Sequence, residues 1–332
     1  MKLKTLLLSA LFALNISVYP LYAEVKVTPV NNREYLPALL NLINTAKKEI
    51  YISQYLFNND ITTSKIKTAL KNAYERKVTI KILFENSVYD NADSFRELSF
   101  FGIETKMDTK FKKTHQKLVI ADNQVLFGST NFSKSSIDNN NETNILLSGA
   151  DIAGYFRDYF DKLWQNSNVT IKPETEELNG ITILHGKKYQ EVILNEIQNA
   201  RKEVFVIMYN MKHYPGENNN NVNALINALA EAKNNGVQVK ILLEKSGFDK
   251  ELNKTNEETA AYLKQKGVNV KFDSIKTITH SKLIIIDNKT VISSSNWTLT
   301  AIKHSREISA VLPDPEISMK YKEYFNSLWN KY

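Results

Sequence analysis

The sequence has 332 residues, of which 42% are hydrophobic and 24% are charged. That length accommodates one large or two ordinary domains, and the apolar fraction is sufficient for a buried core. Cysteine is absent, which excludes a disulfide framework, zinc–thiolate and iron–sulfur sites and a cysteine nucleophile. The formal net charge of +7 is a modest basic excess, compatible with anionic partners but not diagnostic of one.

The first 23 residues have the pattern of a secretory signal peptide. Lys2 and Lys4 precede an uncharged run over residues 5–18, and the small residue Ala23 ends the segment. The apolar run is too short to span a bilayer comfortably, although an uncleaved N-terminal anchor is the alternative. We therefore expect residues 1–23 to be removed and the mature protein to be secreted or periplasmic.

The rest of the chain contains two copies of one unit. Residues 114–122 read Thr-His-Gln-Lys-Leu-Val-Ile-Ala-Asp, and residues 279–287 read Thr-His-Ser-Lys-Leu-Ile-Ile-Ile-Asp. The same offset relates Trp164 to Trp329, and segments further upstream match at smaller offsets. Self-similarity of this kind indicates a duplicated structural unit. The sequence thus predicts a first repeat at 24–167 and a second repeat at 168–332.

Helices and strands are expected to alternate through each repeat. Apolar residues at helical spacing predict helices, and runs rich in β-branched and aromatic residues predict strands. The elements expected in the first repeat are a helix at 34–47, a strand at 49–57, a helix at 63–75, a strand at 78–84, a helix at 93–101, strands at 118–121, 124–127 and 144–147, and a helix at 152–164. Nearly continuous Val, Ile and Leu strands predict a mostly buried sheet flanked by helices, so the fold class is α/β. The polar stretch 165–179 is the expected linker between the repeats.

Each repeat places a histidine two residues before a lysine. These pairs are His115 with Lys117 and His280 with Lys282. Side chains two residues apart in a strand point to the same face. An imidazole beside a cation is unfavourable in an apolar core, but it suits the binding of an anion such as a phosphate. The remaining histidines, at positions 185, 213 and 304, have no counterpart in the other repeat and are expected to be solvated.

Polar residues follow each histidine–lysine pair at equivalent positions. Hydroxyl and amide groups can hold phosphate oxygens, so four residues are expected to bind the substrate phosphate. They are Ser129, Asn131, Ser294 and Asn296. Glu142 and Glu307 each lie 11 residues beyond the asparagine. A carboxylate that accepts a hydrogen bond from a histidine ring fixes the tautomer and raises the basicity of the ring, so both glutamates are expected to contribute to catalysis.

The complete pattern is His-x-Lys-x4-Asp-x5-Gly-Ser-x-Asn. It runs from His115 to Asn131 and again from His280 to Asn296, with Ser293 in place of the glycine. This pattern resembles the paired HKD motif of the phospholipase D superfamily, and the resemblance covers essentially the whole mature chain. The family includes phospholipases D, cardiolipin hydrolases, bacterial endonucleases and phosphatidyl-transferases.

The resemblance implies a single active site between two pseudo-twofold-related halves that pack into one body. One histidine attacks phosphorus and forms a phosphohistidine, and the other protonates the leaving oxygen and then activates water. By analogy with the family, His115 is the expected nucleophile and His280 the acid/base, although the near-symmetry leaves the reverse assignment open. Lys117 and Lys282 would stabilise the phosphoryl oxygens together with the two asparagines, so neither a metal ion nor another cofactor is expected.

The aspartates of the motif have a different expected role. Asp122 and Asp287 are expected to hold the turn after each strand and to be structural.

Two substrate classes fit this chemistry, phospholipids and nucleic acids. Neither repeat carries a dominant basic stripe, which weakens the electrostatic case for a nucleic-acid groove. The leading hypothesis is a secreted, metal-independent phosphodiesterase of phospholipase D type, monomeric, that acts on phospholipid at a membrane surface. An endonuclease of the same superfamily is the alternative, and a phosphatidyl-transferase and an inactive binding module are disfavoured. The second repeat is longer around 211–221 and 245–258, where substrate selection is expected.

Overall fold

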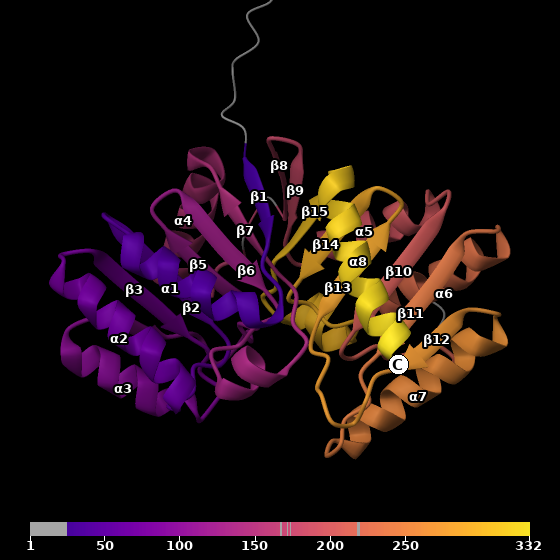
Figure 1. Cartoon of the computed structure of the whole chain (residues 1–332), viewed down its shortest axis with the longest axis horizontal. Helices are drawn as coiled ribbons and strands as arrows, with labels where there is room; N and C mark the ends of the chain where they lie inside the picture. Colours follow the sequence, from indigo (N-terminus) through magenta and orange to yellow (C-terminus); the bar gives the residue numbers. More distant parts are fainter. Residues whose placement is uncertain (1–24, 167, 171, 173, 218–219) are drawn as a thin grey trace, which may run out of the picture.

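The computed structural model describes residues 25–332 except 167, 171, 173, 218 and 219. The expected signal peptide at 1–23 lies outside the described residues. Two β-sheets lie beside each other, one formed by the indigo-to-magenta part of the chain and the other by the later part (Figure 1). Helices lie against both sheets, so the α/β class predicted from the sequence is confirmed.

The first sheet has seven strands in the order β1-β7-β6-β5-β2-β3-β4. Its strands are β1 (Lys26–Pro29), β2 (Glu49–Gln54), β3 (Thr79–Phe84), β4 (Glu104–Met107), β5 (Lys117–Ala121), β6 (Gln124–Gly128) and β7 (Asn144–Ser148). Strands β2, β3 and β4 are parallel, and the other neighbours pair in antiparallel fashion. The helices of this half are α1 (Tyr35–Thr45), α2 (Ile61–Glu75), α3 (Asn91–Phe101) and α4 (Ala150–Gln165), with short helical turns η1 (Asn32–Glu34) and η2 (Ser135–Asn139).

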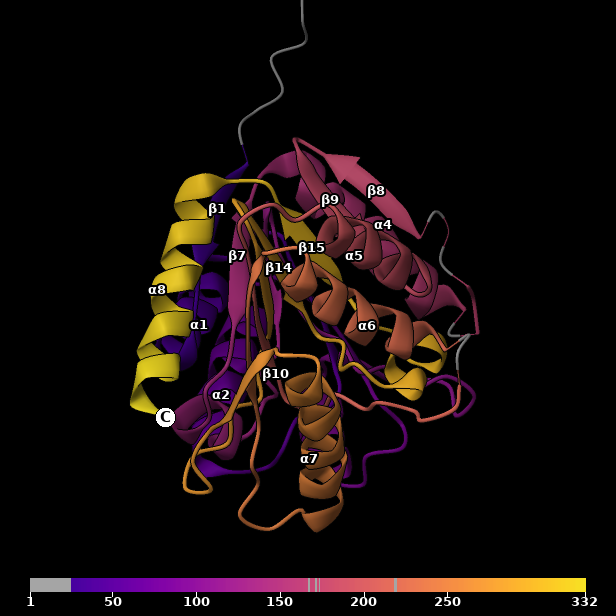
Figure 2. The ribbon, with the colours of Figure 1, turned by 90° about the vertical axis from the view of Figure 1, so that its right-hand side faces the viewer.

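The second sheet repeats this arrangement with eight strands in the order β12-β11-β10-β13-β14-β15-β9-β8. Its strands are β8 (Thr175–Leu178), β9 (Ile181–Leu184), β10 (Glu203–Met208), β11 (Gln238–Leu243), β12 (Asn269–Phe272), β13 (Lys282–Ile286), β14 (Lys289–Ser293) and β15 (Ser309–Leu312). Its helices are α5 (Lys188–Gln198), α6 (Asn221–Asn234), α7 (Lys250–Gln265) and α8 (Pro315–Lys331), with the turn η3 (Thr300–His304). Helix α8 lies on one side of this sheet, and α5 and α6 lie on the other (Figure 2).

The elements expected in the first repeat are present within a few residues of their predicted bounds. One expectation is wrong in part. The stretch 165–179 is not only a linker, because its last residues form β8, which pairs with β9 at the edge of the second sheet. This strand reads Thr-Glu-Glu-Leu and stays partly exposed, so it lacks the apolar pattern by which buried strands are recognised.

The apolar interior joins the two halves. One hydrophobic cluster combines β5 and α4 of the first half with β10, β13 and α8 of the second half. Phe156 and Phe160 on α4 and Phe325 on α8 are fully buried in it. Two further clusters fill the space between each sheet and its remaining helices. The shared cluster makes the two halves one body. No helix in the described part of the chain is long and apolar enough to cross a bilayer.

Two aspartates fasten one end of the central strands. Asp122 lies in the turn between β5 and β6 at φ +49°, and its carboxylate accepts hydrogen bonds from the backbone N–H groups of residues 47–49 at 2.8–3.1 Å. Asp287 does the same for residues 201–203 at 2.8–3.0 Å. These backbone hydrogen bonds lower the pKa of both carboxyls although partial burial opposes ionisation. Each aspartate thus ties the start of β2 or β10 to the adjacent β-turn, at the opposite end of the strand from the histidine.

Strand register defines the edge at which the motif residues lie. Gln54 at the end of β2 pairs with Lys117 at the start of β5, and also with Phe84 at the end of β3. In the second half, Met208 pairs with Lys282 in the same way. We call this the histidine edge: it is the edge where β2, β3, β4, β10, β11 and β12 end and where β5 and β13 begin.

Candidate active site

Each histidine of the motif is paired with the glutamate of the opposite half. Nδ1 of His115 lies 2.9 Å from Oε1 of Glu307. Nδ1 of His280 lies 3.1 Å from Oε2 of Glu142. A carboxylate on Nδ1 fixes the ring orientation and leaves Nε2 for chemistry. The structure therefore brings both expected histidines and both expected glutamates into one site, with a crosswise pairing that the sequence left open.

Backbone hydrogen bonds cross the same boundary. The N–H of His115 donates to the carbonyl of Arg306 at 3.0 Å, and the N–H of His280 donates to the carbonyl of Asn141 at 2.9 Å. Arg306 and Asn141 directly precede Glu307 and Glu142 in sequence. These two backbone hydrogen bonds therefore fix the position of each histidine relative to its glutamate. Neither half forms a complete site without the other.

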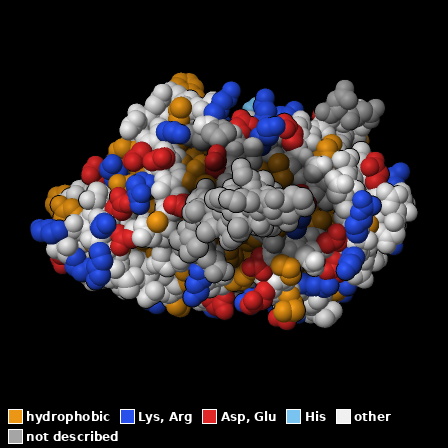
Figure 3. Space-filling view, turned by 90° about the horizontal axis from the view of Figure 1, so that it is seen from above, with side chains coloured by type: hydrophobic (Ala, Val, Ile, Leu, Met, Phe, Trp, Pro, Cys, Tyr) orange, Lys and Arg blue, Asp and Glu red, His pale blue; other side chains and the backbone are white. Residues whose placement is uncertain are grey.

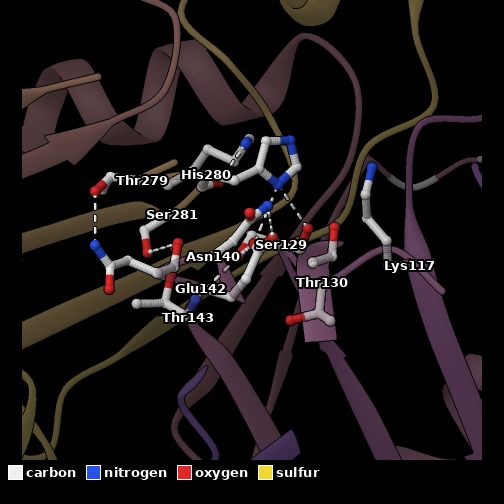
Figure 4. Close-up of polar contacts among 12 residues, drawn as sticks. Lys117, Ser129, Thr130, Asn140, Glu142, Thr143, Thr279, His280 and Ser281 are labelled. Carbon is white, nitrogen blue, oxygen red and sulfur yellow. Dashed lines mark hydrogen bonds and ion pairs between the residues drawn. The ribbon is translucent and has the colours of Figure 1, made fainter. Parts of the chain in front are cut away.

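The motif serines hold the glutamates. The hydroxyl of Ser129 donates to Oε2 of Glu142 at 2.5 Å, and the hydroxyl of Ser294 donates to Oε2 of Glu307 at 2.5 Å. Figure 4 shows Ser129 and Glu142 beneath the ring of His280. These contacts give the serines a positioning role that the sequence analysis did not foresee. Their expected binding of a substrate phosphate stays a prediction.

The motif lysines are almost completely buried. The Nζ of Lys117 donates to the carbonyl of His115, and the Nζ of Lys282 donates to the carbonyl of His280 at 2.5 Å. Burial lowers the pKa of Lys117 to about 7 and that of Lys282 to about 8. A bound anion such as a phosphate would stabilise the charged form of each lysine and raise its pKa again.

Two tyrosines complete the walls of the site and were missed by the sequence analysis. The ring of Tyr55 lies 4.7 Å from the ring of His115 and 4.8 Å from Nζ of Lys117. Tyr209 stands in the same relation to the second motif, at 4.8 Å from the ring of His280 and 4.9 Å from the lysine. Both directly follow equivalent strands, β2 and β10, so alignment of the repeats contained the signal.

The motif asparagines have unused hydrogen-bonding groups. Within the described residues, the side-chain oxygen of Asn131 and that of Asn296 are buried without a partner. Asn131 is itself buried, and both residues come shortly after a strand that ends at the histidine edge. Buried amides are rarely left unpaired. The unpaired atoms here are acceptors, so only the NH₂ group of each side chain could donate to a phosphate oxygen.

The glutamates of the two histidine–glutamate pairs differ in pKa. Burial raises the pKa of Glu307 to about 8. Burial acts in the same direction on Glu142, but His280, Lys282 and Ser129 stabilise the carboxylate and hold its pKa below the usual value. Burial also lowers the pKa of both histidines. For His115, the positive charges of the nearby lysines lower the pKa further. Glu142 is therefore the more readily ionised of the two glutamates, because burial of Glu307 is less fully offset by its neighbours.

A buried arginine breaks the symmetry further. Nη1 of Arg306 donates to Oδ2 of Asp108 at 2.8 Å, and both side chains are buried. Asp108 also accepts the hydroxyl of Thr114, directly before the histidine. Asn141 of the first half is the equivalent of Arg306 in the second half, and Asp273 of the second half is the equivalent of Asp108.

Asp273 lies against a second carboxyl, Glu244, instead of a cation. Burial and the hydrogen bond to Asp273 raise the pKa of Glu244 to about 9. Burial raises the pKa of Asp273 as well. The two carboxyls are therefore best described as sharing a proton, because like charges in contact cannot both ionise cheaply.

Ser293, the departure from the family pattern, is compensated locally. In the first half, the N–H of Thr130 donates to Oδ1 of Asn144 at 3.1 Å, and a Cβ on Gly128 would lie 2.6 Å from that same oxygen. In the second half, the N–H of Ser295 donates to Oγ of Ser293 at 2.8 Å. The serine hydroxyl thus takes over the acceptor role of Asn144.

The sequence predicts that the remaining histidines are solvated. His304 is exposed, as expected. The expectation for His185 is wrong, because it is buried, stacks on Tyr159 at 4.5 Å and lies with Nε2 2.9 Å from the hydroxyl of Tyr155. Burial lowers its pKa to about 4, so it is a neutral packing residue. Among the described residues, no group of three or more His, Asp and Glu side chains is arranged to hold a metal ion.

Comparison with known proteins agrees with this geometry. The family described as "Cardiolipin synthase, PLD-like domain" matches residues 39–164 and again residues 193–329. The chain belongs to the phospholipase D superfamily. The resemblance seen in the paired motif is thereby confirmed, and with it membership in a superfamily of phosphodiesterases.

Relatives in this superfamily match parts of the chain. A phospholipase D of Rickettsia bellii is 33% identical over 130 residues, which are 39% of this chain and 58% of that protein. A phospholipase D of Rickettsia felis is 30% identical over 182 residues, 51% of this chain and 84% of that protein. The crystal structure of phosphatidylserine synthase from Haemophilus influenzae superposes with a TM-score of 0.68 at 14% identity, covering 92% of this chain and 86% of that one. This last likeness shows the phospholipase D fold alone.

The buried arginine generates a paired stability prediction. Asp108→Asn removes the carboxylate that faces Arg306, and breaking a buried ion pair costs about 3–5 kcal/mol. The equivalent change Asp273→Asn replaces a carboxyl that has no cation, so it should alter the free energy of unfolding by less than about 1 kcal/mol. Urea unfolding of both variants at neutral pH measures the difference. Equal losses in the two variants would show that the two sites are equivalent after all.

Proposed function

We propose that this protein is a metal-independent phosphodiesterase of phospholipase D type that hydrolyses phospholipid. The observation that carries the reaction type is the crosswise pairing of His115 with Glu307 and of His280 with Glu142. It orients two imidazoles from opposite halves, in a site that also contains two buried lysines. The relatives named phospholipase D support phospholipid as the substrate class.

In the proposed mechanism His115 is the nucleophile. Its Nε2 lone pair attacks phosphorus, a covalent N–P bond forms, and the bond from phosphorus to the head-group oxygen breaks. The lowered pKa of His115 keeps this ring neutral before attack, which a nucleophile requires. Lys117 and Lys282 stabilise the charge on the non-bridging oxygens, with Asn131 and Asn296 as further donors.

His280 is the proposed acid and base. It donates its proton to the leaving oxygen, so that the head group departs as a neutral alcohol. Burial lowers the pKa of His280, but the carboxylate of Glu142 opposes this shift and stabilises the imidazolium form, which Glu307 with its raised pKa does less well. The same ring then accepts a proton from water, which attacks phosphorus, breaks the N–P bond and releases phosphatidic acid. The opposite pKa shifts of Glu142 and Glu307 support this division of roles over the reverse one.

Substrate class and reaction are tested together. In EDTA, purified protein is incubated with phosphatidylcholine, cardiolipin, DNA and RNA, and head-group release and strand cleavage are measured. We expect head-group release from phospholipid, and a loss of about 10³-fold or more in His115→Ala and in His280→Ala, because both histidines are needed in both steps of the cycle. His304→Ala, on an exposed turn, is the matched control and should retain activity.

The opposite pattern overturns the phospholipid proposal. Cleavage of DNA or RNA without head-group release would establish the endonuclease alternative. Retention of more than a few per cent of activity in either histidine variant would contradict a shared two-histidine site.

The pH dependence of kcat/KM follows from the buried lysines. These ammonium groups lose their protons as pH rises, and kcat/KM reports ionisation of the free enzyme. We therefore expect kcat/KM to fall on the alkaline side with apparent pKa values near those of Lys117, about 7, and Lys282, about 8. The profile of kcat should stay flat to higher pH, since bound phosphate stabilises both ammonium groups. Steady-state kinetics from pH 5 to about pH 10 measures both parameters, and a kcat/KM that does not decline above pH 8 contradicts this account.

We propose further that residues 1–23 direct export and are removed, so that the enzyme acts outside the cytoplasm, secreted or in the periplasm. The basic start, short apolar run and Ala23 support this. N-terminal sequencing of protein recovered outside the cytoplasm should begin near Glu24. Recovery of the intact N-terminus in the membrane fraction would support the uncleaved anchor instead. Both half-sites come from one chain, which supports a monomer as the active unit.

A further inference from the structure

Exposed apolar side chains gather at the histidine edge. The described part of the chain has eight exposed large hydrophobic residues. Four of them are in the loops that leave or enter the strands at this edge: Tyr89 is 90% exposed, Phe111 90%, Phe248 75% and Ile275 62%. Exposed aromatic side chains in several loops around one site mark an interaction surface more strongly than single scattered ones.

The strand topology places these four loops at the same edge of the two sheets, the histidine edge. Tyr89 follows β3 and Phe248 follows β11, at equivalent positions of the two repeats. Phe111 lies between β4 and β5, and Ile275 lies between β12 and β13, in the segments that lead directly to the two histidines. Strands β3, β4, β11 and β12 all end at the histidine edge. Figure 2 shows the loops beside α7 projecting below the second sheet.

Within each half the two loops are packed against each other. A Cβ on Gly247 would lie 2.7 Å from the carbonyl oxygen of Ile275, so the turn that carries Phe248 touches the loop that carries Ile275. In the first half, the N–H of Thr114 donates to the buried carboxyl of Glu85 at 2.5 Å and ties the corresponding loops. The loops that carry the apolar side chains are therefore held in place by contacts with each other.

Basic residues flank the apolar tips. Phe111 stands between Lys110 and Lys112 and is followed by Lys113, and Lys276 follows Ile275. Of these lysines only Lys112 is partly buried. Nζ of Lys113 lies 5.9 Å from the ring of Tyr55, which packs on His115, so the basic cluster reaches the site itself.

The opposite edge of the sheets also has exposed apolar residues, among them Phe100 and Tyr74 near the ends of α3 and α2. Figure 3 looks onto that edge, and basic and acidic side chains are interspersed there. Apolar tips flanked by lysines, as at Phe111 and Ile275, are typical of a surface that binds anionic membranes, because the side chains enter the head-group region while the ammonium groups meet lipid phosphates.

We propose that Tyr89, Phe111, Phe248 and Ile275 form a docking surface that inserts into an anionic phospholipid bilayer and sets the histidine edge against the lipid head groups. The inference rests on the proposed function, since it supplies that site with a substrate presented in a membrane. It commits to a lipid surface because lysines flank the two tips that precede the histidines and extend to the site.

Vesicle binding tests the surface independently of catalysis. Phe111→Ser combined with Phe248→Ser removes two tips and leaves the packed residues unchanged. Binding to vesicles of phosphatidylglycerol and phosphatidylcholine, measured by co-sedimentation, should fall by about tenfold or more, as expected for loss of two partly inserted aromatic rings. The control is Phe100→Ser, which is 96% exposed near the end of α3 that lies away from the histidine edge, and it should bind like the wild type. Binding of the wild type should weaken as salt is raised and should be weaker to pure phosphatidylcholine.

Activity measurements separate this proposal from the proposed function. The double variant should hydrolyse vesicle phospholipid about tenfold more slowly, but it should hydrolyse dihexanoyl-phosphatidylcholine below its micellar concentration at the wild-type rate. If vesicle binding needs the rings of Phe111 and Phe248 but the protein hydrolyses no phospholipid, the docking surface is supported and the proposed hydrolysis of phospholipid is refuted. Hydrolysis of the monomeric lipid without ring-dependent vesicle binding would overturn the surface. Self-association of the wild type that the double variant loses, without vesicle binding, would also overturn it, because the tips would then join two copies of the chain.

Discussion

The site depends on hydrogen bonds that cross between two halves of one chain. Glu307 orients His115, and Glu142 orients His280, so each ring takes its position from the other repeat. Each glutamate is held in turn by the serine of its own half. The shared hydrophobic cluster beneath the interface keeps the two sheets at a fixed separation. Because a packed interior deforms little, the separation of the two sheets sets the distance between the two imidazoles.

The sequence predicted most of the fold and the identity of the central residues. Duplication exposed His115, His280 and their lysines, because chance rarely repeats a nine-residue pattern at one offset. The helices were visible from their apolar spacing. Strand β8 was not, because a polar strand at a sheet edge has one face in water and lacks a continuous apolar run.

The contacts between the halves could not be predicted from the sequence, for a physical reason. Equal spacing in both repeats is compatible with a glutamate that pairs within its own half or across, and only the packing of the sheets decides. The same holds for Asp108 and Arg306, which lie far apart in the chain and have no matching pair in the other repeat. His185 was misjudged because its stacking on Tyr159 joins the two halves, a contact that no local pattern indicates.

Arg306 has a consequence for how such a site can be built. In a symmetric dimer of either repeat, the residues at positions 108 and 273 would face identical neighbours, and the two histidines would have equal proton affinities. Because both repeats here belong to one polypeptide, one copy has arginine where the other has Asn141. A gene fusion therefore gives more than stable association. The surroundings of the two imidazoles can then differ, so that selection can adjust the proposed proton donor His280 and the proposed nucleophile His115 separately.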